Sequence, residues 1–319
     1  MQRLVARSVN AVLRRIGIRL VREATLARLE QIAAENNPHL SIGQPYTNTT
    51  LGVDELRLAL DNLRGELLRD GIRQSWRIAD LIAKHITEGS TLVCALCGHE
   101  SQVESFEVFA SRCAFGGGEL IRHRCPSCGV IFGPAKMLAL TDGELAEEYE
   151  LHYRAYLEGD STTDELRAFY ALNPVPSGRY LNFGSGKWSE TTELLRRQGW
   201  DVWSFEPHQA ATPSVHPYVL RSWAEIGDAS FDGIFSNNVL EHLRYPIASL
   251  RRMAVSLRPA SLMSHATPCF EYQYEYTRFH LYFFTGRARE LIASAAELRS
   301  VSFEKDGIFM CWTLRTESN

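Results

Sequence analysis

Apolar residues follow two different periods along the chain, and these periods predict its elements. Residues 5–21 carry valines, leucines and isoleucines at helical spacing, which returns over 53–69 and 72–86. Further along, short apolar runs typical of buried strands alternate with helical segments. These runs lie at 180–183, 201–205 and 231–236. Strands that alternate with helices predict a doubly wound α/β sheet.

The end of the chain predicts a hairpin. Alternating runs at 298–304 and 308–315 flank the turn Lys305-Asp306-Gly307, and Asp-Gly is a strong hairpin signal. The last strand is therefore expected to be antiparallel to its neighbour in an otherwise parallel sheet. Upstream of this hairpin, 270–276 alternates aromatic with polar residues. That alternation predicts an extended strand or lid with one aromatic face.

A glycine turn follows the first strand of the sheet. Gly184-Ser185-Gly186 comes directly after 180–183, Ser189 is the predicted N-cap of a helix, and Glu206 ends the next strand. Glycine lets the backbone turn tightly and lets a ligand approach it. A terminal carboxylate about twenty residues after the glycines can accept hydrogen bonds from two ribose hydroxyls. This arrangement predicts a cofactor that contains adenosine.

Three later segments extend the pattern in a fixed order: FDGIFSNNVLEHL at 231–243, SLRPASLMSHATP at 256–268 and HLYFFTGRARELI at 280–292. With the glycine turn, they resemble class I S-adenosylmethionine (SAM)-dependent methyltransferases over 176–315. The resemblance implies a Rossmann-like fold and methyl transfer from SAM.

The resemblance also implies a set of cofactor contacts. The glycine turn would hold the methionyl part of the cofactor, Glu206 the ribose, and the segment after the third strand the adenine. Two asparagines would lie at the edge where cofactor and acceptor meet. The chain departs from the family at Asn182, where an acid is usual, and at Trp188, where a glycine is common. Two alternatives follow: a working site that Trp188 covers, or a degenerate one. The implied residues are Asn182, Gly184, Ser185, Gly186, Glu206, Trp223, Glu225, Asn237 and Asn238.

Histidines are the candidate general bases, because imidazole titrates near neutral pH and can take a proton from a hydroxyl. His280 is preferred, since it precedes a predicted helix in a loop expected to overhang the pocket; His242 is the second candidate and His265 a third. Asn238-x-x-Glu241-His242 also resembles the Glu-x-x-Glu-His pattern of metal-assisted methyltransferases, with Asn in the first position. A divalent cation at the active site is therefore the less favoured prediction.

Two Cys-x-x-Cys pairs, each followed by glycine, lie upstream of the predicted sheet. The glycines permit the turns of two knuckles, and four thiolates suit one tetrahedral zinc ion. Because four thiolates leave no open coordination position, this zinc is expected to be structural. The predicted zinc-ribbon ligands are Cys94, Cys97, Cys125 and Cys128.

The motifs predict four regions. Residues 1–88 are expected to be helical, 89–139 to form the zinc ribbon, 140–175 to be a helical linker and 176–319 to form the methyltransferase domain. The first helix is rich in arginine and amphipathic. Such a helix can pack on its own protein, pair with a second copy in a homodimer or lie on an anionic membrane surface.

Composition limits the function classes. The 319 residues are 45% hydrophobic and 23% charged, as in ordinary soluble proteins, and the formal net charge is -4. Seven cysteines with a predicted thiolate site, and no signal-peptide pattern, predict a reducing cytoplasm, with the inner membrane surface as an alternative location. No segment is apolar enough to span a membrane.

The resemblance implies transfer of a methyl group to a hydroxyl or carbon of a sugar, surface glycan or small metabolite. One alternative is a zinc-ribbon RNA methyltransferase, although the net charge of -4 makes a nucleic-acid partner less favoured. The other is a noncatalytic scaffold, which the departures at Asn182 and Trp188 suggest.

Overall fold

The computed structural model divides the chain into two units, residues 1–60 and 61–319. The predicted arginine-rich helix and Trp188 lie outside the described residues, and of the first unit only 53–60 is described. The described residues are 53–87, 91–156, 159–186, 189–207, 216–226, 231–304 and 309–314.

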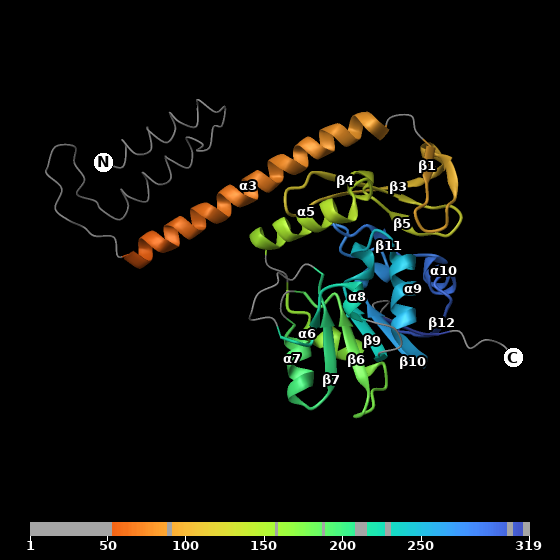
Figure 1. Cartoon of the computed structure of the whole chain (residues 1–319). Helices are drawn as coiled ribbons and strands as arrows, with labels where there is room; N and C mark the ends of the chain where they lie inside the picture. The colour runs from red at the N-terminus through yellow and green to blue at the C-terminus, as the bar shows by residue number, and fades with distance from the viewer. Residues whose placement is uncertain are drawn as a thin grey trace, which may run out of the picture. The chain divides into compact units, whose positions relative to one another are not determined.

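Seven strands form the central sheet of the second unit, in the order β12-β13-β10-β9-β6-β7-β8 (Figure 1). The strands from β8 to β10 in this order are parallel, whereas β13 is antiparallel to both β10 and β12. The predicted doubly wound sheet with an antiparallel last strand is therefore confirmed. The bounds are β6 Arg179–Phe183, β7 Asp201–Phe205, β8 Val219–Leu220, β9 Phe231–Asn237, β10 Leu257–Ala266, β12 Leu298–Phe303 and β13 Phe309–Leu314.

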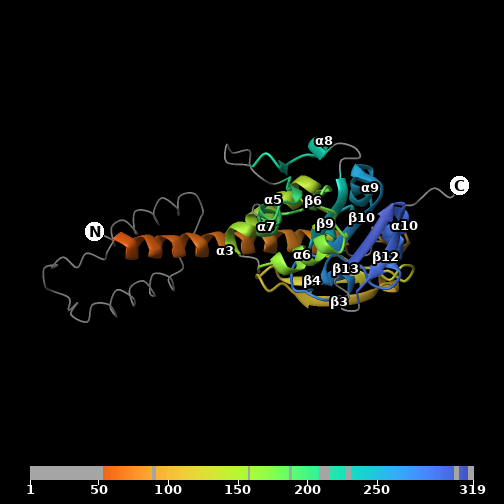
Figure 2. The same cartoon turned by 90° about the horizontal axis from the view of Figure 1, so that it is seen from below.

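Helices cover both faces of this sheet (Figures 1 and 2). Side chains alternate across a strand, so Tyr180 packs with Phe169 on one face, while Leu181 packs with Leu250 and Ile292 on the other. Phe169 belongs to α6, which lies in the predicted linker but packs against β9 and β10. The domain boundary at 176 stays a prediction. The helices are α6 Thr162–Tyr170, α7 Glu190–Arg197, α8 Trp223–Ile226, α9 Pro246–Ser256 and α10 Ala288–Ala295.

The cysteine-rich segment forms two small sheets. β1 (Thr91–Val93) and β2 (Glu100–Gln102) make a hairpin. A four-stranded sheet follows in the order β11-β5-β4-β3, in which β11 (Tyr282–Phe283) comes from the segment between β10 and α10. A strand from the predicted methyltransferase region thus completes the ribbon sheet. The other members are β3 Glu107–Arg112, β4 Glu119–Arg124 and β5 Ile131–Phe132.

A single helix, α3 (Val53–Thr87), stands where two helices were predicted over 53–69 and 72–86. The apparent break is Gly71, and one glycine costs a helix only about 1 kcal/mol relative to alanine. Contacts just after Gly71 stabilise the helix by more than this cost. Ile72 and Trp76 are buried, and the Trp76 indole N–H donates to Glu148 Oε2 (2.6 Å). No described helix is long and apolar enough to cross a bilayer.

Glu148 belongs to α5 (Asp142–Ala155), which follows the short helix α4 (Ala135–Leu138). α5 begins with a capping box, in which Thr141 and Glu144 each accept the other's backbone N–H. The local sequence therefore fixes the start of the helix that packs on Trp76.

The aromatic segment 270–276 is not a strand. Phe270 closes the 3₁₀ helix η3 (Pro268–Phe270), and 271–280 continues without helix or strand. Tyr272 packs between the rings of Phe109 and Phe283, 4.9 and 4.7 Å away, while Tyr274 has a left-handed backbone with φ 57°. The strand prediction was wrong: Tyr272 is held between two rings, whereas Tyr274 and Tyr276 are exposed and their rings lie 5.6 Å apart.

Candidate active site

The order of the sheet reverses between β6 and β9, which makes this pair its topological switch point. In open α/β sheets, ligands bind beyond the carboxyl ends of the strands at such a point. The predicted glycine turn follows β6, and the predicted asparagine and histidine residues follow β9. The fold therefore brings the two groups of predicted site residues to the same edge.

The glycine turn is built from left-handed backbone. Gly184 and Gly186 have φ of 73° and 72°, and the N–H groups of Gly184 and Ser185 donate to Phe205 O at 2.9 and 3.2 Å. A Cβ on Gly184 would lie 2.6 Å from Val239 Cγ2, whereas a Cβ on Gly186 would meet none of the described residues within 4 Å. As far as the described residues reach, the space at Gly186 fits the close approach of a cofactor to the backbone.

Glu206 lies beneath this turn. It follows β7, is 7% exposed, and its Oε2 accepts the N–H of Gly186 at 3.0 Å. Its own N–H donates to Leu220 O at 2.9 Å and so fixes it to the end of β8. The position suits the predicted contact with a ribose, which stays a prediction.

Asn182 is 1% exposed and joins the turn to α6. Its Nδ2 donates to Glu165 Oε2 (2.9 Å) and lies 3.1 Å from Ser189 Oγ and 3.3 Å from Thr192 Oγ1. Ser189 caps α7 as predicted, accepting the N–H of Thr192 at 3.1 Å. The sequence analysis missed Glu165, because it lies in the predicted linker and carries no motif of its own.

The predicted adenine side is densely packed. The Trp223 ring lies 5.3 Å from Phe183 and 5.2 Å from Phe205, with the Arg252 guanidinium 4.3 Å from its centre. Glu225 caps its own short helix instead: its two oxygens accept the N–H of Arg221 and the hydroxyl of Ser222, each at 2.9 Å. These bonds, that of the Arg221 N–H first, lower the pKa of Glu225. A purine would have to compete with them.

Asn237 is the last residue of β9, and Asn238 follows it. Asn237 has a buried Nδ2 with no hydrogen-bond partner among the described residues. Asn238 is exposed, adopts a left-handed φ of 52°, and donates its backbone N–H to Ala266 O at 2.9 Å. The orphan amide of Asn237 at this edge is a donor that a ligand could satisfy.

Beyond the asparagines, Glu241, His242 and His280 converge. One ligating atom from each lies within 4.8 Å of the other two, and the two imidazole centres are 4.8 Å apart. Leu281 N–H donates to Glu241 O (2.8 Å), and Thr267 Oγ1 donates to Glu241 Oε1 (2.6 Å). The structure thus brings His280, His242 and the buried Glu241 of the Asn-x-x-Glu-His pattern together; their roles stay predictions.

Both imidazoles are neutral at physiological pH. Burial lowers the pKa of His242 to about 4, and burial with the neighbouring His242 and Arg122 lowers the pKa of His280 well below its usual value. The His242 ring bonds to the Phe279 backbone, while its buried Nδ1 has no partner among the described residues. Nδ1 of His280 lies 3.3 Å from Cys269 Sγ.

Neutral imidazoles beside a carboxylate suit either proton transfer or a divalent cation. The cation stays a prediction. His265, the third candidate base, is part of the core: its Nδ1 is 2.7 Å from Ser236 Oγ, its ring packs on Trp312, and burial lowers its pKa to about 3.

The ribbon holds the segment that carries His280. Arg122 of β4 is fully buried, and its guanidinium donates to the carbonyls of Glu275 (2.9 Å), Thr277 (2.7 Å) and His280 (3.3 Å) and to Ser111 Oγ (3.1 Å). Further along, β11 pairs with β5. The ribbon therefore holds both ends of the segment that carries His280.

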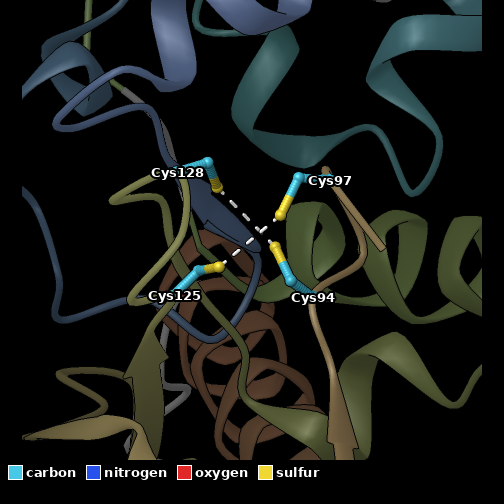
Figure 3. Close-up of side chains that lie close together, drawn as sticks. All are labelled: Cys94, Cys97, Cys125 and Cys128. Carbon is cyan, nitrogen blue, oxygen red and sulfur yellow. Dashed lines mark hydrogen bonds between the residues drawn. The ribbon is translucent and has the colours of Figure 1, made fainter. Parts of the chain in front are cut away.

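The four predicted zinc ligands converge in two knuckles (Figure 3). Sγ of Cys94 lies 3.8 Å from that of Cys128, and Sγ of Cys97 lies 3.6 Å from that of Cys125. Tetrahedral zinc with bonds of about 2.3 Å requires sulfurs about 3.8 Å apart. Contact with Cys128 and burial raise the pKa of Cys94, so a cation is needed to favour its thiolate. The cysteines fit a closed zinc site.

Comparisons with known proteins point to one domain family. Residues 152–301 match a family model described as a methyltransferase domain. Comparison with curated proteins gives no match. Among solved structures, Burkholderia thailandensis 1,6-didemethyltoxoflavin-N1-methyltransferase, with bound 1,6-didemethyltoxoflavin and S-adenosylhomocysteine, is 19% identical, with a TM-score of 0.43 over 60% of this chain and 94% of that one.

Two further structures are more distant. A phosphoethanolamine-type N-methyltransferase 2 from Haemonchus contortus is 14% identical, with a TM-score of 0.39 over 50% of this chain and 45% of that one. A SAM-dependent methyltransferase from Mesorhizobium loti is 14% identical, with a TM-score of 0.33 over 46% and 95%. Because these likenesses are weak, the assignment depends on the domain match.

Proposed function

Because residues 152–301 form a class I SAM-dependent methyltransferase domain, we propose that this protein methylates a hydroxyl or carbon of a sugar, surface glycan or small metabolite. A hydroxyl acceptor must lose a proton when it is methylated. The observation that supports this acceptor class is the pair of neutral imidazoles, His242 and His280, beside Glu241 at the carboxyl edge of the sheet.

Each part of the site has a proposed task. When bound, SAM supplies an electrophilic methyl group on its sulfonium. The backbone at Gly186 and the carboxylate of Glu206 bind and orient the cofactor, and the Asn237 amide meets the ligand where cofactor and acceptor adjoin. In-line placement of the two reactants then supplies much of the rate.

The proton acceptor is best assigned to His242. Its ring donates to the Phe279 backbone, so Nδ1, which has no partner within the described part of the chain, carries the lone pair. The preferred base of the sequence analysis, His280, already contacts Cys269 through Nδ1 and bonds to the Tyr274 backbone. We therefore assign His280 the second place, as a neighbour that orients His242.

Calorimetric titration of the zinc-loaded full chain with SAM and S-adenosylhomocysteine tests the cofactor site first. Binding of both in the micromolar range is expected, and hydroxyl-bearing sugars and metabolites would then be screened with radiolabelled SAM. No binding of either ligand would favour the noncatalytic scaffold, with Trp188 as the first residue to substitute.

An RNA acceptor has less support. Within the predicted ribbon, 89–139, four glutamates balance three arginines and one lysine. Of the arginines, Arg122 is buried and Arg124 pairs with Glu107 at 2.7 Å. The ribbon therefore lacks the surplus of positive charge that nucleic-acid binding requires. The proposed zinc ion would hold the two knuckles together without taking part in methyl transfer.

A further inference from the structure

A carboxylate from α6, a helix distant in sequence, lies beside the glycine turn. Position 182 carries a neutral amide, but Glu165 of α6 places Oε2 2.9 Å from Asn182 Nδ2 and 3.1 Å from Ser189 Oγ. Both neighbours donate to it. The carboxylate is therefore held beside the turn, between the end of β6 and the start of α7.

Among the described residues, no basic side chain matches the charge of Glu165. Glu165 is partly exposed, and no described lysine or arginine forms an ion pair with it. Its known donors are neutral: Asn182, Ser189 and, on Oε1, the Ser161 hydroxyl at 2.6 Å. With about four lone-pair sites, the carboxylate keeps capacity for one more donor. A cation that arrives at the turn would meet an ionised partner already in position.

We propose that Glu165 is a cofactor-binding residue whose carboxylate receives the ammonium group of the methionyl part of SAM. The inference rests on the proposed function, since it presupposes that SAM binds at the glycine turn. Asn182 and Ser189 then act as positioning residues, which aim the carboxylate instead of supplying the charge. The neutral residue at 182 is thus compensated by α6 and does not mark a degenerate site.

The competing explanation is that Glu165 only braces α6 against the turn. A brace would support every ligand of the turn equally, whereas an ammonium partner acts only on ligands that carry an ammonium. S-adenosylhomocysteine has this group, and 5′-methylthioadenosine keeps the adenosine and thioether but lacks the amino acid. The pair of ligands therefore separates the two roles.

The experiment is calorimetric titration of the full chain and its Glu165→Gln variant with both ligands. The isosteric amide is expected to weaken the binding of S-adenosylhomocysteine about tenfold and to change the affinity for 5′-methylthioadenosine by less than about twofold. Asp164→Asn, which removes a carboxylate from the same helix turn, is the control and should leave both affinities unchanged. Equal weakening of both ligands, or no weakening, overturns the inference.

A second variant keeps the test independent of damage to the fold. Adding Asn182→Asp to Glu165→Gln returns a carboxylate to the turn from β6, and it should recover most of the lost affinity for S-adenosylhomocysteine. Failure to recover it in a double variant that melts like the wild type would contradict the charge role. If the wild type binds 5′-methylthioadenosine but not S-adenosylhomocysteine, Glu165 is misassigned while the site survives; if it binds neither, the proposed function fails as well.

Discussion

Replacing Arg122 by Met should loosen the segment that carries His280 without touching the cofactor turn. The guanidinium is fully buried and donates to three backbone carbonyls between 275 and 280 and to Ser111 Oγ. A buried acceptor left without a donor costs about 1 to 3 kcal/mol. Glu275 O keeps the Ser111 hydroxyl as a donor at 2.9 Å, so only the carbonyls of Thr277 and His280 would be left unpaired. Two carbonyls would cost between about 2 and 6 kcal/mol, and since the irregular segment can turn towards water, we expect about 2 to 4 kcal/mol.

That loss is smaller than the stability of most domains, about 5 to 15 kcal/mol, so the variant should still fold. Chemical denaturation would measure the loss, and hydrogen exchange would locate it. The N–H groups of Leu281 and Ala114 are the reporters, because they bond to Glu241 O and Tyr276 O at 2.8 and 2.9 Å. Both should exchange faster in Arg122→Met, while the N–H groups of β6 and β7 should not change.

Arg124→Met is the matched control. Arg124 lies on the same strand, but it is 40% exposed and pairs with Glu107 at the surface, where an ion pair contributes at most about 1 kcal/mol. If Arg122→Met lost no more stability than Arg124→Met, or if hydrogen exchange at Leu281 stayed slow, the ribbon would not hold the segment that carries His280.

Four further predictions concern the rest of the site. Cys94→Ser should lower the zinc content of the purified protein from one equivalent to nearly none by atomic emission, and a full equivalent would refute the four-thiolate site. Glu206→Ala should weaken S-adenosylhomocysteine by about 1 to 3 kcal/mol in calorimetry, and unchanged affinity would remove it from the ribose site. His242→Asn should slow turnover of an identified acceptor about 100-fold with unchanged cofactor affinity. If only His280→Ala caused such a loss, His280 and not His242 would be the general base. Burial lowers the pKa of His265 to about 3 from its ordinary 6.5, so at intermediate pH the unfolded chain binds a proton at this residue and the folded chain does not. The free energy of unfolding therefore falls as the pH drops from 6.5 towards 3, by up to about 1.4 kcal/mol per pH unit. His265→Gln should flatten this slope in acid denaturation.

The features that the sequence predicted well are those that local chemistry fixes. Gly184 and Gly186 require a left-handed backbone, Ser189 caps the helix that follows, and both observations hold in the structure. The cysteine knuckles are equally local, because four residues and a glycine close each turn. A short segment contains enough information for such elements, so one sequence suffices to predict them.

The features that were missed depend on contacts between distant segments. Glu165 reaches Asn182 only because α6 packs on the sheet, and nothing in the local pattern of α6 distinguishes it from a connecting helix. The two residues of β11 form a strand because β5 offers an edge, not because of their own period. The two helices predicted over 53–69 and 72–86 form one helix, α3, which the buried Trp76 anchors just after Gly71.

The same distant contacts give the two proposed halves of the site different supports. The proposed cofactor half, with the glycine turn and Glu165, lies at the edge of the sheet. The proposed acceptor half depends on the ribbon: Arg287 N–H donates to Cys128 O at 2.9 Å, and a Cβ on Gly129 would lie 2.9 Å from Gly286 Cα. The second knuckle therefore touches the start of α10 directly, just after the segment that carries His280. A metal that closes this knuckle would therefore support the proposed acceptor half, while the proposed cofactor half depends on the sheet.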